Sequence, residues 1–468
     1  MKKLLLLTLS MLLVLSSSAF AATTTYRLFP IDTDFDEVSG YNEETDFTSI
    51  TDIVEAAETE GETEIIIQLI ENYSLGDPDD DEGEGESITF EENIESLTNI
   101  TIAGSGHRII AAGAQRHLVL NAADLTLTLD NVELTGFPGG NSGGIEINAG
   151  TLIANNVSFT GLGLEYNAGG AINLGESGSA TFTNCTFTGN TATEGGAIYS
   201  TGTLTLTGTN RFSGNTANTD GGALYILSGR VSLDGVVFGD GTRSARNVAN
   251  GNGGAIYVSN EGIVSLGGSY LNTNSADLGG ALYVAGSLTL TSANTFTGNM
   301  ATNGGAIYLA ENSSLTITGT DTQTFTSNTA TSLGGALYAG QSSSLSWAAP
   351  VAFTERNTAA RGGAMWIHAG SQVNGITSTV DFTNNIADYG GALYVSINNS
   401  STLTLSSSSG WTFSGNKANY DGGAIYTVAA DVVASGLEVQ EENSAENAGG
   451  FTPQGFTTTT IPLSTRSR

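Results

Sequence analysis

Acidic side chains are the residues of this 468-residue chain that could carry out acid–base chemistry. Hydrolysis of a glycosidic bond needs two carboxylates that face the same bond, and elimination from a polysaccharide needs a basic residue that accepts a proton. In the glycine-rich part of the chain the candidate groups are isolated from one another: Asp220, Asp234, Asp277, Asp321, Asp381, Arg211, Arg230 and Arg361. The sequence therefore predicts a protein that is not an enzyme and has no catalytic residues and no cofactor; an extracellular polysaccharide lyase or hydrolase is the alternative.

A serine-nucleophile motif, G-x-S-x-G, occurs from Gly140 to Gly144, and His107 and His117 precede it. In hydrolases this motif lies on a sharp turn between a strand and a helix. No helix is indicated after Gly144, and a chain with 62 glycines contains such strings by chance. The single cysteine, Cys185, has no histidine or basic neighbour in the sequence, so we expect a small buried residue rather than a nucleophile.

The acidic stretch from Asp77 to Glu86 resembles a calcium-binding loop because aspartates alternate along its first half. An EF-hand loop has glycine at its sixth position and glutamate at its twelfth. Here Glu82 and Ile88 stand at those positions. We expect a solvated acidic loop, with weak calcium binding as the alternative, and no metal site is predicted.

The first 21 residues have the features of a signal peptide. Lys2 and Lys3 precede an apolar run from Leu4 to Leu15, and Ala19 to Ala21 provides a small-x-small cleavage site. That run is too short for a membrane span, and no other stretch is longer, so no transmembrane helix is predicted. We expect an exported chain that begins at Ala22 after cleavage.

The net charge of -33 is concentrated near the start of the chain, where no Lys or Arg occurs between Leu28 and His107. Such a surface repels nucleic acid, which is excluded as a partner. Within this acidic region, residues 22–95, we expect one helix at 48–60 with Ile50, Ile53, Val54 and Ala57 on one face and a capping box at its start. Short strands follow at 64–75 and 97–106, so the helix is expected to cap the end of a stacked sheet.

Glycine pairs recur at intervals of 25 to 32 residues from Gly143 to Gly449. A fixed period of this length is typical of a solenoid. Between Gly195 and Asp220 three short β-type runs are separated by Gly, Asn, Ser and Thr, with no helical periodicity. The sequence therefore predicts an all-β, single-stranded parallel β-helix with three short strands per coil over residues 96–451, followed by a threonine-rich tail or cap at 452–468.

Comparison of the coils predicts which side chains face the core. The position after Gly-Gly-Ala is always apolar, for example Ile198, and the position two further on is mostly apolar, for example Ile226. Because side chains alternate across a strand, we expect these columns inside and the intervening alanine and aromatic columns outside. The aromatic column is a possible binding face: Tyr199, Tyr225, Tyr257, Tyr283, Tyr308, Tyr338, Trp366, Tyr394 and Tyr426. Equally, these rings could stack on one another as a structural ladder.

Two further columns have structural roles in this interpretation. In F-x-x-N the Phe fills the core and the Asn lies at a corner, where its amide bonds to the next coil: Asn190, Asn215, Asn299, Asn328, Asn385 and Asn416. The Gly pairs mark the next corner, where positive φ and close approach of coils are expected: Gly195, Gly221, Gly304, Gly334, Gly390 and Gly422.

Alternation of F-x-x-N with G-G-A-[ILM] over roughly residues 141–451 resembles the repeats of the chlamydial polymorphic outer-membrane proteins. The resemblance implies a right-handed β-helix that acts as the passenger of an autotransporter and as a surface adhesin. Family members typically continue into a C-terminal barrel, and we expect this chain to lack one because only "FTPQGFTTTTIPLSTRSR" follows the last repeat. The implied body is therefore an adhesin whose export route differs from that of the family.

The resulting prediction is a non-catalytic adhesin, on the outer-membrane surface or secreted, that binds a host or neighbouring-cell surface protein or glycan along its lateral face. Self-association through an uncovered solenoid end is a further possibility. A threonine ladder that binds ice is a third alternative, but "SLSW" and "IVSLGG" interrupt the Thr-Leu-Thr-Leu pattern.

Overall fold

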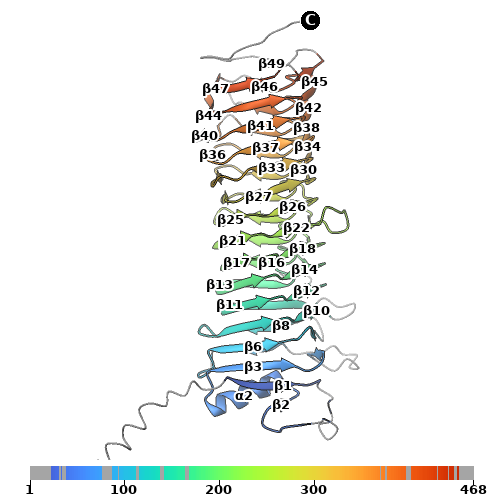
Figure 1. The fold of residues 1–468 in the computed structure, drawn as a ribbon, viewed down its shortest axis with the longest axis vertical. Coiled ribbons are helices and arrows are strands. Elements are labelled where there is room, and N and C mark those ends of the chain that lie inside the picture. The colour runs from blue at the N-terminus through green and yellow to red at the C-terminus, as the bar shows by residue number, and fades with distance from the viewer. Residues whose placement is uncertain are drawn as a thin grey trace, which may run out of the picture.

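The computed structural model is a parallel β-solenoid whose coils stack in one straight column (Figure 1). It describes residues 23–452 except 31–32, 34–37, 39, 76–86, 93, 112–114, 137–141, 164–167, 369, 375–376, 397–401, 429–430, 441 and 447–450. The predicted signal peptide, the possible calcium loop and most of the predicted tail lie outside the described residues. Every strand pair joins successive coils in parallel, so the predicted parallel β-helix is confirmed.

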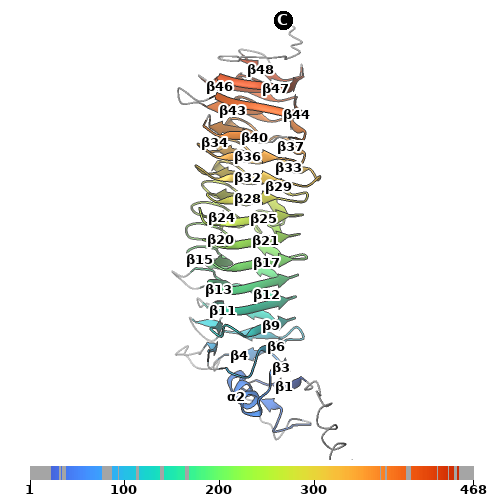
Figure 2. The same cartoon turned by 90° about the vertical axis from the view of Figure 1, so that its left-hand side faces the viewer.

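One coil illustrates the architecture. It contains β16 (Ile198–Ser200), β17 (Thr203–Thr207), β18 (Arg211–Ser213) and β19 (Thr216–Ala217). The first two strands belong to one sheet, which we call sheet A, while β18 belongs to sheet B and β19 to sheet C. The two columns of sheet A run side by side along the solenoid (Figure 2). The three predicted strands are therefore present, and a short fourth strand follows the corner asparagine.

The strands of the repeat region occupy these columns in regular order. The first column of sheet A contains β16, β20 (Leu224–Ile226), β24 (Ile256–Val258), β27 (Leu282–Val284), β31 (Ile307–Leu309), β35 (Leu337–Ala339), β39 (Met365–His368), β43 (Leu393–Ser396), β46 (Ile425–Val428) and β49 (Phe451–Thr452). The second contains β17, β21 (Arg230–Asp234), β25 (Ile263–Gly267), β28 (Ser287–Leu290), β32 (Ser314–Ile317), β36 (Ser344–Trp347) and β40 (Gln372–Asn374).

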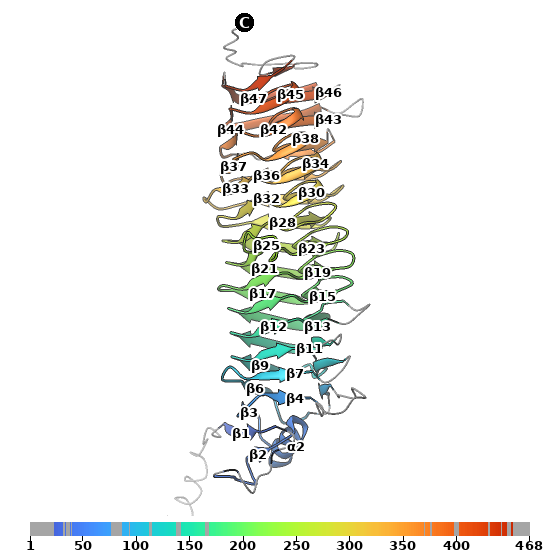
Figure 3. The ribbon, with the colours of Figure 1, turned by 90° about the vertical axis from the view of Figure 1, so that its right-hand side faces the viewer.

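Sheet B runs the length of the molecule and contains β4 (Tyr73–Ser74), β7 (Arg108–Ile110), β10 (Glu133–Thr135), β12 (Ser158–Thr160), β14 (Thr186–Thr188), β18, β22 (Val237–Phe238), β26 (Tyr270–Asn272), β29 (Thr295–Thr297), β33 (Gln323–Thr326), β37 (Val351–Thr354), β41 (Val380–Thr383), β44 (Thr402–Ser414) and β47 (Asp431–Val439). Sheet C is formed by short strands in two stacks (Figure 3): β15 (Thr191–Ala192), β19 and β23 (Val248–Ala249), then β30 (Met300–Asn303), β34 (Thr329–Leu333), β38 (Thr358–Arg361), β42 (Ile386–Tyr389), β45 (Lys417–Asp421) and β48 (Ser444–Ala445).

The N-terminal coils extend sheet A through β1 (Thr24–Leu28), β2 (Asp46–Phe47), β3 (Glu64–Leu69), β5 (Ile88–Phe90), β6 (Asn99–Ala103), β8 (Arg116–Leu120), β9 (Thr126–Asp130), β11 (Gly143–Asn155) and β13 (Ile172–Thr183). Helix α2 (Ile50–Glu60) lies at this end of the column, with Ile50, Ile53 and Ala57 buried. The Ser49 hydroxyl accepts a hydrogen bond from the Asp52 amide, as expected for the helix cap. The predicted capping helix is confirmed, and it closes the open end of the core.

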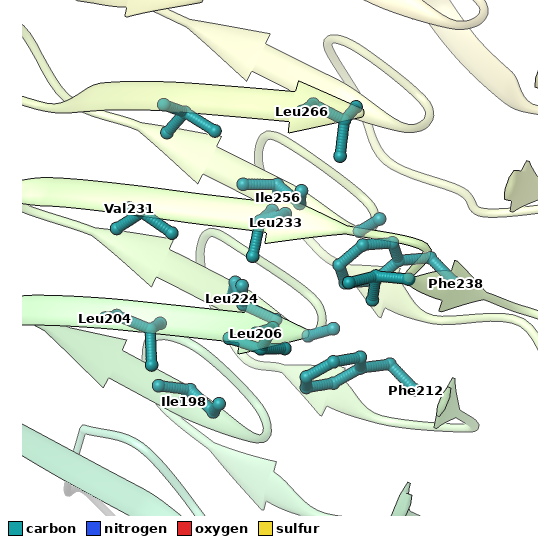
Figure 4. Close-up of a cluster of buried hydrophobic side chains, with 14 of the residues drawn as sticks. Ile198, Leu204, Leu206, Phe212, Leu224, Val231, Leu233, Phe238, Ile256 and Leu266 are labelled. Atoms are coloured by element: carbon teal, nitrogen blue, oxygen red, sulfur yellow. The ribbon is translucent and has the colours of Figure 1, made fainter. Parts of the chain in front are cut away.

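The core consists of stacked columns of like residues (Figure 4). In-register pairing places Leu224 over Ile198 and Ile256 over Leu224, and all three are fully buried. Leu204 and Leu206 point inward from β17 while the threonines between and beside them face outward. The expected alternation across these strands is therefore present.

The alanine column is an error of the sequence-based prediction, which placed it outside. Ala197 and its equivalents in the other coils are fully buried. Both Ala197 N–H and Ile198 N–H donate to the carbonyl oxygen of Ala223, each at 2.9 Å. Because two successive amides share one acceptor, the backbone still turns at the alanine, and strand alternation begins only at Ile198.

Candidate functional site

A continuous column of buried asparagines lies at the corner between sheets B and C. Asn215 illustrates the bonding: its Nδ2 donates to Asn247 Oδ1 at 2.9 Å and to the carbonyl of Phe187 at 3.0 Å. Its own Oδ1 accepts from the main-chain and side-chain nitrogens of Asn190. Every polar atom of the buried carboxamide is thereby satisfied, which fully buried amides require.

The structure brings all six asparagines singled out from F-x-x-N into this column. It also adds four more: Asn247, Asn274, Asn357 and Asn443. Asn247 does not match F-x-x-N because the loop 239–246 separates it from Phe238. The spacing of six residues before Gly253 and before Gly449 would have identified Asn247 and Asn443 from the sequence.

The two glycines of each pair are required for different reasons. The first has positive φ, between 61° and 69° for the six glycines named from the repeat. The second contacts the next coil: a Cβ on Gly335 would lie 1.9 Å from the carbonyl oxygen of Gly363. No side chain fits at the second position, so the Gly pair sets how closely successive coils approach.

The nine predicted binding-face aromatics lie in one column on sheet A. From Tyr199 to Trp366 the rings stack with centroids 4.3 to 5.3 Å apart and planes within 11° of parallel. Tyr394 and Tyr426 continue the column as a pair at 5.3 Å. We call these nine residues the aromatic ladder. Its rings are half-buried or buried, with Trp366 only 6% exposed.

This stacking determines what the ladder can offer to a ligand. Each internal ring has both faces covered by neighbouring rings, so a ligand cannot stack on it. Only ring edges and hydroxyl groups remain for contact with a ligand. Burial raises the pKa of Tyr257 to about 12, with smaller effects from the hydroxyl of Tyr283 and the charge of Asp220. The ladder therefore presents a row of neutral phenols.

Acidic groups flank one end of the ladder. Burial and the charge of Asp220 raise the pKa of Glu194, and burial raises the pKa of Tyr225, with smaller contributions from both carboxylates. Glu194 and Asp220 stand directly before the Gly pairs of successive coils. The Asp220 carboxylate is occupied, because it accepts a 2.6 Å hydrogen bond from the Asn252 amide. Within the described residues, no group of three His, Cys, Asp or Glu is placed to bind a metal.

The remaining candidate residues are placed apart from one another. His117 is fully buried in β8, where its Nε2 lies 2.9 Å from the Thr135 carbonyl, whereas His107 is partly exposed in a turn. Burial lowers the pKa of His117 to about 4, partly offset by main-chain hydrogen bonds. Cys185 is buried, and burial raises the pKa of its thiol to about 11. Such a thiol is a poor nucleophile at neutral pH.

The outward column beside the ladder mixes threonine with serine: Thr205, Ser232, Ser265, Thr289, Thr316 and Ser346. Regular threonine spacing, on which the ice-binding alternative depends, is thus interrupted at three positions. An open polar hollow of about 660 Å³ lies nearer the N-terminus, between Glu91, Asn121 and Asn148. Asn148 and Asn121 bond to each other there, and Asn121 bonds to Glu91.

Comparison with known protein families gives one match. The model of the Chlamydia polymorphic membrane protein repeat matches six segments: residues 184–201, 211–227, 295–310, 324–340, 379–396 and 412–428. The matched segments contain the six corner phenylalanines and asparagines described above. Comparisons with curated proteins and with solved structures gave no match. No helix in the described part of the chain is long and apolar enough to span a membrane.

Proposed function

Because the chain belongs to the Chlamydia polymorphic membrane protein repeat family, we propose that it is a non-catalytic attachment rod. It acts at the outer-membrane surface or after secretion, and it binds a surface protein or glycan of a host or neighbouring cell. Family membership is the observation that carries this proposal.

The division of roles between interior and exterior supports the proposal. Inside, the coils from Phe187 onward repeat the same aliphatic, phenylalanine and asparagine columns, with Leu271 in place of phenylalanine in one coil. Outside, the position before each Gly pair changes from coil to coil: Glu194, Asp220, Asn252, Leu278, Asn303, Leu333, Arg361, Tyr389 and Asp421. A solenoid of this kind can vary its surface without altering its core, and extended lateral surfaces are what such proteins use for binding.

In this proposal the aromatic ladder forms a straight row of contact groups on the lateral face. Its phenol hydroxyls contact the partner, while ring stacking holds them in line. A triple variant, Tyr283→Phe, Tyr308→Phe and Tyr338→Phe, keeps the stack and removes three hydroxyls. We expect weaker binding to cells with an unchanged melting temperature. Unchanged binding would show that these hydroxyls do not contact the partner.

Attachment itself can be tested with the purified full-length protein coupled to fluorescent beads. We expect saturable binding to cultured host cells or to cells of the source organism, and competition by the free protein. Beads coated with an unrelated β-solenoid of similar net charge control for nonspecific adsorption. Binding no greater than that control would contradict an attachment role.

A further inference from the structure

Near the C-terminal end of the column, two further tyrosines pack beside Tyr426, the last member of the aromatic ladder. Tyr389 lies with its ring centroid 5.2 Å from that of Tyr420 and 5.3 Å from that of Tyr426. The ring planes are inclined by 36° and 55°, whereas the ladder rings from Tyr199 to Trp366 lie within 11° of parallel. We call Tyr389, Tyr420 and Tyr426 the tilted cluster.

The inclination leaves an aromatic surface open to solvent. Tyr420 is 46% exposed on β45, and among the described residues its ring has one aromatic neighbour, Tyr389, whereas each internal ladder ring has two. An accessible ring face attracts polarised C–H groups because the face of the π-system is electron-rich. The apolar face of a pyranose ring presents a patch of such C–H groups.

Polar side chains belong to the same two strands as Tyr389 and Tyr420. Asn419, which is exposed and precedes Tyr420 in β45, donates through Nδ2 to Asp388 Oδ1 at 2.8 Å, and the half-buried Asp388 precedes Tyr389 in β42. The register of β38, β42 and β45 places Arg361 and Asp421 on either side of Tyr389 along the axis. Carboxylate, amide and guanidinium groups together supply acceptors and donors for a ring of hydroxyls.

We propose that the tilted cluster is a glycan-binding site, in which a hexopyranose stacks on Tyr420 and its hydroxyls bond to Asp388 and Asn419. This assignment rests on the proposed attachment function, for which it names the ligand class and the place. An aromatic surface with a few convergent polar groups is the usual composition of a small-ligand site.

Charge favours neutral sugars over sialylated or sulfated ones. The chain carries a net charge of -33, and two carboxylates, Asp388 and Asp421, belong to the site. Arg361 and the exposed Lys417 balance these locally but leave no excess positive charge. An anionic glycan would therefore find no excess positive charge at this site to attract it.

The test uses an array of neutral oligosaccharides based on glucose, galactose, mannose and N-acetylglucosamine, with sialylated and sulfated glycans on the same array. The purified full-length protein is compared with Tyr420→Ala, Tyr420→Phe and Tyr270→Ala. Tyr270 is the matched control, since it is 52% exposed on β26 and has no aromatic neighbour among the described residues.

We expect a neutral glycan to bind the wild type, Tyr420→Phe and Tyr270→Ala alike. Tyr420→Ala should bind at least about tenfold more weakly, the usual effect of truncating a central aromatic contact. Equal melting temperatures show that the loss is not due to unfolding. No binding to any neutral glycan, preference for anionic glycans, or equal binding by Tyr420→Ala would each overturn the assignment.

The bead assay separates this inference from the attachment proposal. If beads coated with the wild type and with Tyr420→Ala adhere to cells equally well, and no glycan binds, the attachment function is supported and the glycan site is contradicted. If a neutral glycan binds in a Tyr420-dependent manner but beads do not adhere to cells, the glycan site is supported and the attachment function is contradicted.

Discussion

Asn299 Oδ1 accepts hydrogen bonds from both nitrogens of Asn274, at 3.0 Å from the main-chain amide and 3.1 Å from Nδ2. Asn299 in turn donates through Nδ2 to Asn328 at 3.0 Å and to the Leu271 carbonyl at 2.9 Å. All of these atoms are buried. One residue therefore satisfies polar groups in the coils on both sides of its own.

Replacement of Asn299 by alanine should strongly destabilise the column. It leaves the Asn274 amide and the Leu271 carbonyl without these partners, and each unsatisfied buried group costs about 1–3 kcal/mol. We expect the free energy of unfolding, measured by urea denaturation, to fall by about 3 kcal/mol or more. The control is Asn218→Ala, an exposed position that should change stability by less than about 0.5 kcal/mol. Similar effects of the two variants would contradict the structural role of the column.

Alanine at the second glycine of a pair should be worse than alanine at a glycine that is only conformationally strained. The Cβ of Gly335→Ala would overlap the Gly363 carbonyl oxygen, whereas Gly189 has φ of 65° and open space around it. Gly189→Ala should cost about 1–2 kcal/mol, the usual price of a left-handed conformation. We expect Gly335→Ala to lose distinctly more in thermal unfolding. The reverse order would show that the coils leave room for a side chain at Gly335 and are not in close contact there.

The aromatic ladder should contribute measurable pairwise stability. Tyr283 and Tyr308 stack at 5.2 Å with planes 7° apart. A double-mutant cycle with Tyr283→Ala and Tyr308→Ala should give a coupling energy of about 1 kcal/mol. Tyr283→Phe, which retains the ring, should be close to wild type. A coupling energy near zero would mean that the rings stack only because the coils are regularly spaced, and that the stack does not stabilise the fold.

Acid should destabilise the N-terminal coils through His117. Its pKa is about 4 in the folded protein because of burial, against about 6.5 in the unfolded chain. The unfolded state therefore takes up a proton first as the pH falls, and stability decreases between about pH 6.5 and pH 4, by roughly 3 kcal/mol in total. Stability from this residue is fully present above that window.

The control for this prediction is His117→Gln, which keeps a side-chain donor but cannot be protonated. Urea unfolding at pH 7 and at pH 4.5 should show a smaller difference for the variant than for the wild type. Carboxylates common to both proteins contribute equally to each and cancel in the comparison. If the wild type and the variant showed the same pH dependence, protonation of His117 would not contribute to the loss of stability in acid.

The sequence predicted the parts of this fold that follow a simple period. Columns such as Ile198, Leu224 and Ile256 could be identified because strand alternation and coil repetition both bring apolar residues to one place. Alternation failed at Ala197, where two amides share one carbonyl and the chain has not yet become a strand. A main-chain hydrogen bond shared in this way does not depend on residue type, so it could not be predicted from the sequence.

The site was predicted less completely for a related reason. A column of aromatic residues was visible in the sequence, but the angle between rings is set by packing. Parallel stacking closes the faces of the ladder, while a bulge between Ala387 and Tyr389 accompanies the inclined rings near Tyr420. The sequence contains Tyr389 and Tyr420 outside the repeated aromatic position, so they did not belong to any column.

Exposure at the cell surface is the central claim, and one loop allows a direct measurement. Residues 239–247, between β22 and β23, stand out from the side of the column in Figure 1, and Arg243 is exposed there. Exposed loop tips are preferred sites of proteolytic nicking. Trypsin applied to intact cells should cut at Arg243, and the variant Arg243→Gln should resist that cut, with the medium assayed in parallel for released protein. Cleavage on intact cells, or recovery from the medium, is the predicted result; cleavage only after the outer membrane has been opened, with none in the medium, would contradict an attachment rod.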